Sequence, residues 1–310
     1  MKIALDPYMH RNVPLLELPK LVAELGYEYI ELSPRADFLD WWVRPRVYPE
    51  RIQEFKKSLR DHDVKLASLL PMYRWASPDQ VERLAALRYW KAAIQVAVEL
   101  ECDTMNSEFG RGPSPDFSSN CFCCTGSKVE SCEAAFWDSM DELVPIFERE
   151  GIKLNIEPHP EDFVETIQPA VDMIRSINSK NVRFLYCAPH TFHFGEDMAR
   201  MIEEAAPVLA HVHVADTFNH KASSGLRYII NPPGAPVRVH QHLNIGEGEV
   251  DWEVFFGTLK KVGFDGIVTS CVFAWEERAV ESSKFMRKEI QRYVDKYWSS
   301  GTTTRPDRTL

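Results

Sequence analysis

Short apolar runs alternate with longer amphipathic segments along most of the chain. The runs have the composition of buried parallel strands, and the longer segments repeat their apolar residues at helical spacing. The predicted strands are Lys2–Leu5, Tyr27–Leu32, Lys65–Leu70, Thr104–Ser107, Ile152–Ile156, Val182–Tyr186, Leu209–Ala215 and Gly266–Ser270. The predicted helices are Leu15–Leu25, Pro49–Asp61, Ser77 to about Leu100, a segment through Trp137 and Phe147 to Gly151, Phe163–Ile177, Glu196–Ala205, Trp252–Val262 and Glu276–Tyr297.

This alternation predicts an α/β fold with a parallel sheet. Eight strand–helix units without a linker predict closure into a (β/α)8 TIM barrel, with residues 1–310 forming one domain. An open doubly wound sheet is the alternative, but no Gly-x-Gly-x-x-Gly follows the first strand. Ser77 and Pro78 are typical of an N-cap followed by Pro in the first turn, and Gly26 is typical of a C-terminal cap.

The composition narrows the class of protein. Of the 310 residues, 45% are hydrophobic, which suffices for a packed core. Lys and Arg total 36 against 46 Asp and Glu, a net charge of −10 without any basic run, so we expect no binding to nucleic acid. No apolar stretch approaches the roughly 18 residues of a membrane span, and Asp6 and Pro7 interrupt the N-terminus too early for a signal peptide. The odd number of seven Cys favours reduced thiols, and we expect a cytoplasmic protein.

Two long connections interrupt the regular alternation. Residues 111–132 form a Cys-bearing insertion loop, in which Cys121, Cys123 and Cys124 lack the paired spacing of a structural zinc site. Residues 218–244, rich in Pro and Gly, follow the seventh strand. Because such connections lie over the active face of a barrel, we expect a lid-like loop there.

Histidines gather at the carboxyl ends of the predicted strands, which meet at one mouth of a barrel. Glu157 ends the fifth strand, His190 follows the sixth, His213 lies on the seventh and His242 ends the long loop after it. Imidazoles combined with a carboxylate suit Mn, Fe or Zn, so these four residues are the predicted metal ligands. His211 shares the face of His213 but lies farther from the mouth, and we expect it to form hydrogen bonds inside the barrel.

These strand ends resemble those of the sugar-phosphate isomerase/epimerase superfamily, the xylose-isomerase-like TIM barrels. The resemblance is carried by Leu154-Asn155-Ile156-Glu157, by His190, by the run from His211 to Asp216, and by the run from His240 to Trp252 with its Ile-Gly-x-Gly-x-x-Asp core. Within the superfamily, the runs Asn178–Val182 and Gly225–Ile229 are similar to inositol-catabolism H-type proteins and to the α-subunits of C-glycoside deglycosidases.

Two positions depart from the epimerase pattern. The epimerases carry an Asp three residues before the strand-six His, where this chain has Cys187, and a Glu at the end of strand eight, where it has Cys271. Either the metal is bound by Glu157 and the histidines, or two thiolates replace the two carboxylates. We favour the first interpretation, because Cys also serves as a small apolar filler.

The resemblance implies one divalent metal, with Mn²⁺ expected and Mg²⁺, Fe²⁺ or Zn²⁺ as alternatives. It implies abstraction of a proton next to the carbonyl of a keto sugar or glycoside, with metal stabilising the charge that develops on oxygen. His159, two residues beyond Glu157, is the predicted base, and Glu108 and Asp216 are candidates for proton return or for orienting that base. We expect His240, Tyr8 and Arg227 to contact the substrate.

Three functions follow from this chemistry. The favoured one is eliminative cleavage of a 3-oxo C-glycoside with release of its aromatic aglycone, a carbon–carbon lyase reaction. The first alternative is a sugar or sugar-phosphate isomerase or epimerase, and the second is a non-catalytic sugar-binding barrel. The deglycosidase resemblance also implies a small β-rich partner subunit in a hetero-oligomer.

Overall fold

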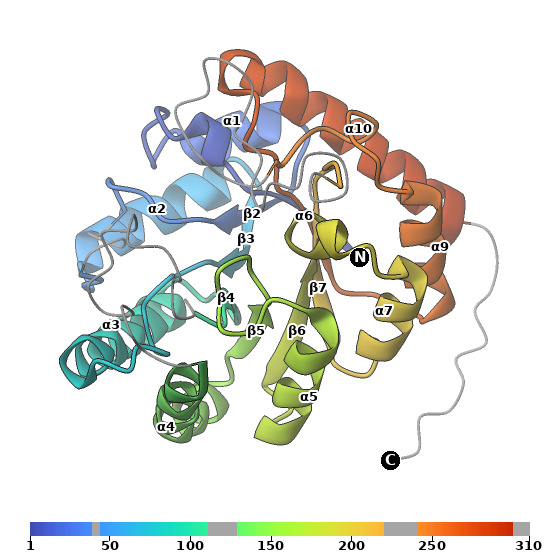
Figure 1. Ribbon diagram of the computed structural model, residues 1–310. Helices are drawn as coiled ribbons and strands as arrows, with labels where there is room; N and C mark the ends of the chain where they lie inside the picture. Colours follow the sequence, from blue (N-terminus) through green and yellow to red (C-terminus); the bar gives the residue numbers. More distant parts are fainter. Residues whose placement is uncertain (39–43, 111–128, 220–240, 300–310) are drawn as a thin grey trace.

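The computed structural model describes residues 1–38, 44–110, 129–219 and 241–299 and confirms the predicted TIM barrel. Eight parallel strands close in chain order, and helices surround them (Figure 1). The strands are β1 (Lys2–Leu5), β2 (Tyr29–Leu32), β3 (Lys65–Leu69), β4 (Thr104–Glu108), β5 (Lys153–Glu157), β6 (Val182–Cys187), β7 (Leu209–Val214) and β8 (Ile267–Ser270). The main helices are α1 (Leu18–Glu24), α2 (Pro49–Asp61), α3 (Gln80–Glu99), α4 (Val129–Glu150), α5 (Ile167–Ile177), α7 (Met198–Ala205), α9 (Trp252–Lys261) and α10 (Ala279–Trp298).

One predicted helix start is wrong. The N-cap of α3 is Asp79, whose carboxylate accepts hydrogen bonds from the backbone N–H groups of Val81 and Glu82. The hydroxyl of Ser77 instead donates to the side chain of Glu82 at 2.6 Å. Asp79 takes the capping position because its side chain reaches two unpaired N–H groups of the first turn.

Short elements between the main helices escape the sequence pattern because they hold too few residues for a periodic signal. They are the short helix α6 (Ala188–Thr191) and the 3-10 turns η1 (Tyr8–His10), η2 (Phe192–Phe194) and η3 (Glu276–Arg278). No helix among the described residues is long and apolar enough to cross a membrane.

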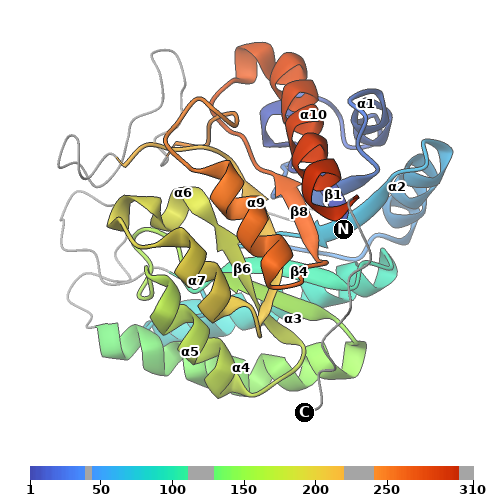
Figure 2. The same cartoon turned by 90° about the vertical axis from the view of Figure 1, so that its right-hand side faces the viewer.

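The strands bury apolar side chains outward against the helices and polar side chains inward. On β7, Val212 and Val214 are buried in the hydrophobic core, whereas His211 and His213, which alternate with them, belong to the polar interior. The side view shows the helices packed along the outside of the strands (Figure 2). Because the polar side chains come from several strands, the fold concentrates them inside one end of the barrel.

Candidate metal and catalytic site

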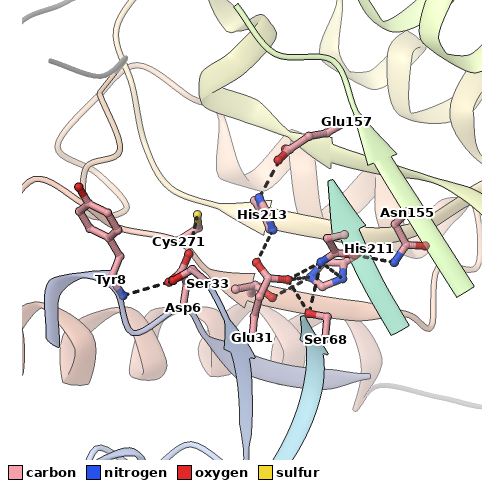
Figure 3. Close-up of polar contacts among 12 residues, drawn as sticks. Asp6, Tyr8, Glu31, Ser33, Ser68, Asn155, Glu157, His211, His213 and Cys271 are labelled. Carbon is pink, nitrogen blue, oxygen red and sulfur yellow. Dashed lines mark hydrogen bonds and ion pairs between the residues drawn. The ribbon is translucent and has the colours of Figure 1, made fainter. Parts of the chain in front are cut away.

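His213 on β7 lies between two buried carboxylates (Figure 3). Its Nε2 lies 2.8 Å from Oε1 of Glu31, and its Nδ1 lies 3.5 Å from Oε2 of Glu157. All three side chains are at most 4% exposed. Within the described part of the chain, Nδ1 of His213 and Oε2 of Glu157 are buried without a hydrogen-bond partner. A cation between them would satisfy both atoms, provided that Nδ1 of His213 is deprotonated.

Two overlapping groups of side chains extend this pair. Glu157, Cys187 and His213 form one, and Cys187, His190 and His242 form the other; in each group the ligand atoms lie within 4.8 Å of one another. The donor set of imidazole, carboxylate and thiol fits a divalent transition metal. The structure thus brings the four predicted ligands together and adds Cys187 to them.

Backbone carbonyls orient two of these imidazoles. Nδ1 of His242 donates to the carbonyl oxygen of Cys271 at 2.7 Å. Nδ1 of His190 lies 3.3 Å from the carbonyl oxygen of Pro158 and 3.2 Å from Oε2 of Glu157, which are both acceptors. Because a carbonyl oxygen only accepts, the proton of each ring lies on Nδ1 and the lone pair on Nε2. Burial lowers the pKa of His242 to about 3 and that of His190 well below its usual value. Both rings are therefore neutral at neutral pH, the state that binds metals.

Glu31 and His213 are a charged pair. Burial raises the pKa of Glu31, but the charges of His213 and His211 and the hydrogen bonds from His213 and Ser68 together outweigh burial and lower it to about 2. Burial likewise lowers the pKa of His213, but the charge of Glu31, together with Cys271, Glu157 and Cys187, outweighs burial and raises this pKa well above its usual value. The proton that faces Glu31 lies on Nε2, and a metal that binds at Nδ1 would displace the second proton of the imidazolium.

A hydrogen-bond network below this pair fixes Glu31. The hydroxyl of Ser68 donates to Oε2 of Glu31 at 2.6 Å, and the side-chain amide of Asn106 donates to the same oxygen. The Asn106 amide also lies 3.1 Å from Nδ1 of His211, whose Nε2 donates to Oγ1 of Thr269 at 2.7 Å. His211 therefore forms hydrogen bonds inside the barrel, below the candidate ligands.

Asp6, directly after β1, is a third buried carboxylate of this interior, beside Glu31 and Glu157. Its Oδ1 accepts from the hydroxyl of Ser33 at 2.7 Å and from the backbone N–H of Tyr8 at 3.0 Å. Its Oδ2 lies 3.9 Å from Sγ of Cys271. Burial and the neighbouring Glu31 raise the pKa of Asp6 to about 7, against the lowering effect of its hydrogen bonds.

His159 and Glu108 form a pair at the rim of the same site. Nε2 of His159 lies 3.6 Å from Oε1 of Glu108, and its Nδ1 donates to the carbonyl oxygen of Pro160 at 2.7 Å. The His159 and His190 rings lie 4.5 Å apart in an edge-to-face arrangement. Both members of the pair are partly exposed, so the predicted base is accessible beside the candidate ligands.

Aromatic rings pack against one of the candidate ligands, His242. Phe273 stacks on His242 with ring centroids 4.3 Å apart, and Tyr8 lies 4.6 Å from Phe273. The Tyr8 hydroxyl accepts a hydrogen bond from Arg11 at 3.1 Å. Tyr8, a predicted substrate contact, therefore lies at this wall.

Comparison with known proteins identifies the family. The family model described as xylose isomerase-like TIM barrel matches residues 19–289. The chain belongs to this family. The membership confirms the superfamily that the strand-end motifs predict.

Individual relatives of this xylose isomerase-like family are distant. Two are named inosose isomerase: that of Bacillus licheniformis is 24% identical over 54% of this chain, and that of Bacillus velezensis 21% identical over 90%. This chain spans 58% of the length of the first and 91% of the second. Among solved structures, the IolI protein with a bound zinc atom has a TM-score of 0.74 at 18% identity, covering 96% of this chain and 100% of its own. A 3-keto-D-glucoside 4-epimerase from E. coli has a TM-score of 0.69 at 18% identity, covering 93% and 99%.

Asp216 forms contacts with the loop that carries the most specific family motif. Its carboxylate accepts hydrogen bonds from the backbone N–H groups of Thr217, Gly246 and Val250 and from the Trp252 indole, at 2.7–3.1 Å. No contact among the described residues joins Asp216 to His159, the predicted base. The contacts support a structural role for Asp216, rather than the proton transfer considered from sequence.

Several predicted residues lie outside the described residues. They are His240, Arg227, Cys121, Cys123 and Cys124, with most of the expected insertion loop and lid-like loop. Cys132, near the start of α4, is described and buried.

Sequence reasoning missed the buried polar residues of the first strands. Glu31, Asp6, Ser68 and Asn106 are each at most 1% exposed, yet none was a candidate. The available signal was a charged residue between Ile30 and Leu32, in a strand that otherwise looks fully buried. A buried charge needs a partner, and this rule alone would have marked Glu31.

Proposed function

We propose that this protein is a divalent-metal-dependent enzyme that removes the proton next to the carbonyl of a keto sugar. The observation that carries the proposal is the meeting of Glu157, Cys187 and His213 with the His159–Glu108 pair at one end of the barrel. Membership of the xylose isomerase-like family and the inosose isomerase relatives support it.

One group of residues would bind the metal, and another would transfer the proton. Glu157 and His213, with Cys187, His190 and His242 around them, would hold the cation. A divalent cation bound there supplies positive charge that stabilises negative charge developing on the carbonyl oxygen. His159 has its proton on Nδ1, so its Nε2 accepts the carbon-bound proton, and the Glu108 carboxylate stabilises the resulting imidazolium.

Within this class, we favour eliminative cleavage of a 3-oxo C-glycoside. The carbon–hydrogen bond next to the ketone breaks, its electron pair forms a carbon–carbon double bond, and the aromatic aglycone leaves the anomeric carbon and takes up a proton. One base suffices for this reaction, and His159 supplies it. Cys187 and Cys271 stand where the epimerases carry carboxylates that move protons, which favours a one-base reaction. We also propose the small β-rich partner subunit that the deglycosidase resemblance implies.

A sugar isomerase or epimerase is the second candidate, favoured by the names of the inosose isomerase relatives. Both candidates share the first step and differ only in the fate of the negative charge after proton removal.

Incubation of the metal-loaded protein with a 3-oxo C-glucoside in deuterated water, followed by NMR, tests both. The assay is run with and without a candidate β-rich subunit. Release of free aglycone supports the lyase, whereas deuterium incorporation or an isomerised sugar without release supports the isomerase. Absence of bound metal together with absence of exchange contradicts both and leaves a sugar-binding barrel.

A further inference from the structure

Cys187 occupies a special position in the candidate site. It is the last residue of β6, it is 2% exposed, and its aligned partner on the neighbouring strand is His213. Because paired residues of neighbouring strands project to the same face, its thiol points into the barrel beside that imidazole. Cys187 is also the one residue common to the Glu157–Cys187–His213 and Cys187–His190–His242 groups.

The second thiol of the interior, Cys271, differs from Cys187. It follows β8 and contacts His213, but its Sγ lies toward Asp6, 3.9 Å from Oδ2. Among the described residues, none of the groups able to hold a metal ion includes Cys271. The two thiols that replace carboxylates of the epimerase pattern are therefore not equivalent.

We propose that Cys187 is a ligand of the metal and that the site selects a thiophilic divalent ion, Zn²⁺, rather than Mn²⁺ or Mg²⁺. The inference rests on the proposed function, because it assumes that the metal binds at Glu157 and His213. Sulfur ligands favour zinc, whereas purely oxygen ligands favour magnesium and manganese. Glu157, Cys187 and His213 are three ligands of the residue types that bind zinc, and zinc sites that keep a position open for substrate have three protein ligands.

Cobalt substitution tests the thiolate directly, because Co²⁺ bound to a thiolate shows a charge-transfer band in the near ultraviolet. The metal-free full-length protein is titrated with Co²⁺, and the wild type is expected to develop this band. Cys187→Ser is expected to lose it. Cys102→Ser and Cys271→Ser are expected to keep it; Cys102 is a buried thiol that contacts the carbonyl of Thr104 at the start of β4.

A competition experiment measures selectivity. The ratio of Zn²⁺ to Mn²⁺ affinity is expected to fall in Cys187→Ser and in Cys187→Asp, which supplies a carboxylate instead, and to stay unchanged in Cys102→Ser. Circular dichroism checks that each variant is folded. X-ray absorption of the zinc-loaded wild type, which needs no variant, is expected to show a zinc–sulfur distance of about 2.3 Å.

The outcomes separate this inference from the proposed function. Cobalt binding without the band, a band that survives in Cys187→Ser, or a zinc spectrum without sulfur overturns the thiolate ligand and leaves the proposed function standing. Failure of the folded wild type to bind Zn²⁺, Co²⁺ or Mn²⁺ overturns both.

Discussion

At the scale of single residues, the site depends on how Glu31 holds His213. Glu31 receives hydrogen bonds from Ser68 and Asn106 and faces Nε2 of His213 at 2.8 Å, so the imidazole presents Nδ1 to Glu157. A carboxylate behind a ligating imidazole fixes the orientation of the ring and raises its basicity.

Replacing Glu31 is therefore expected to weaken metal binding. In Glu31→Gln, the amide no longer supplies the charge that orients His213, and metal affinity is expected to fall by about 10- to 100-fold. Titration against a chromophoric chelator measures this, with the exposed Glu28→Gln as the matched control. Equal affinities of the two variants would contradict this role.

His159 is expected to matter for turnover and not for metal content. His159→Ala removes the base, which is expected to lower the rate by about 10²- to 10⁴-fold or more, while metal analysis gives the wild-type stoichiometry. His62→Ala, at the C-terminal end of α2, is the control, since the imidazole of His62 pairs with the carbonyl of Ser58 in the same helix. Retained activity in His159→Ala would show that another group is the base.

The predicted ligands Glu157, His190, His213 and His242 could be found from sequence because strand ends meet in a barrel. The charge of Glu31 in a buried strand could have marked it as a residue in need of a partner, but the sequence could not show that the partner is His213, because that depends on which strand interiors face each other.

At the scale of elements, the loop 241–251 is organised by one buried carboxylate and two glycines. Gly246 has a φ of +85° and donates its N–H to Asp216, and a Cβ at Gly248 would collide with Oδ1 of Asp216 and with the backbone of Thr217. Asp251 then caps α9 by accepting from the N–H of Val254 at 3.0 Å. The Ile-Gly-x-Gly-x-x-Asp motif, read from sequence as a family signature, is thus a structural device that delivers His242 to the site.

Gly248→Ala is expected to destabilise the protein by about 1–3 kcal/mol, because the new methyl group overpacks a rigid contact. Gly257→Ala within α9 is the matched control: its Cβ would have ordinary contacts with Tyr297, and Ala favours a helix over Gly by about 1 kcal/mol. Denaturant unfolding compares the two. A Gly248→Ala protein as stable as the wild type would contradict the tight packing of Gly248 against Asp216 and Thr217.

At the scale of the whole molecule, the sequence predicted the closed barrel well because eight short strand segments alternate with eight amphipathic helical segments. Every strand lies within a few residues of its expected place. The residues that line the inside of the barrel, in contrast, were predicted only at the carboxyl ends of the strands. A single Ser or Asn in a strand, such as Ser68 or Asn106, does not by itself indicate a buried hydrogen-bond network.

A polar interior that unites several strands links metal binding to global stability. Metal at 100 times its dissociation constant is expected to add about 2.7 kcal/mol to the free energy of unfolding, because it binds the folded state. Thermal unfolding with and without a chelator measures the effect as a higher melting temperature of the loaded protein. A melting temperature that does not respond to any divalent metal would contradict a site that spans β5, β6 and β7.

Neighbouring strands of the barrel are paired over different lengths. β3 and β4 align at Leu69 and Met105, whereas β4 and β5 align from Thr104 opposite Lys153 to Glu108 opposite Glu157. Backbone amides near the first seam are expected to exchange with deuterated solvent sooner than those of β5, because fewer ladder bonds must open. The side chains of Glu31, Ser68 and Asn106 form hydrogen bonds that join β2, β3 and β4 inside the barrel. These bonds reinforce the place where the backbone pairing of β3 and β4 is short. A metal held by β5, β6 and β7 does not touch β3 and β4. Measuring hydrogen exchange of the β3 and β4 amides with and without metal would show how far its binding slows the opening of these two strands.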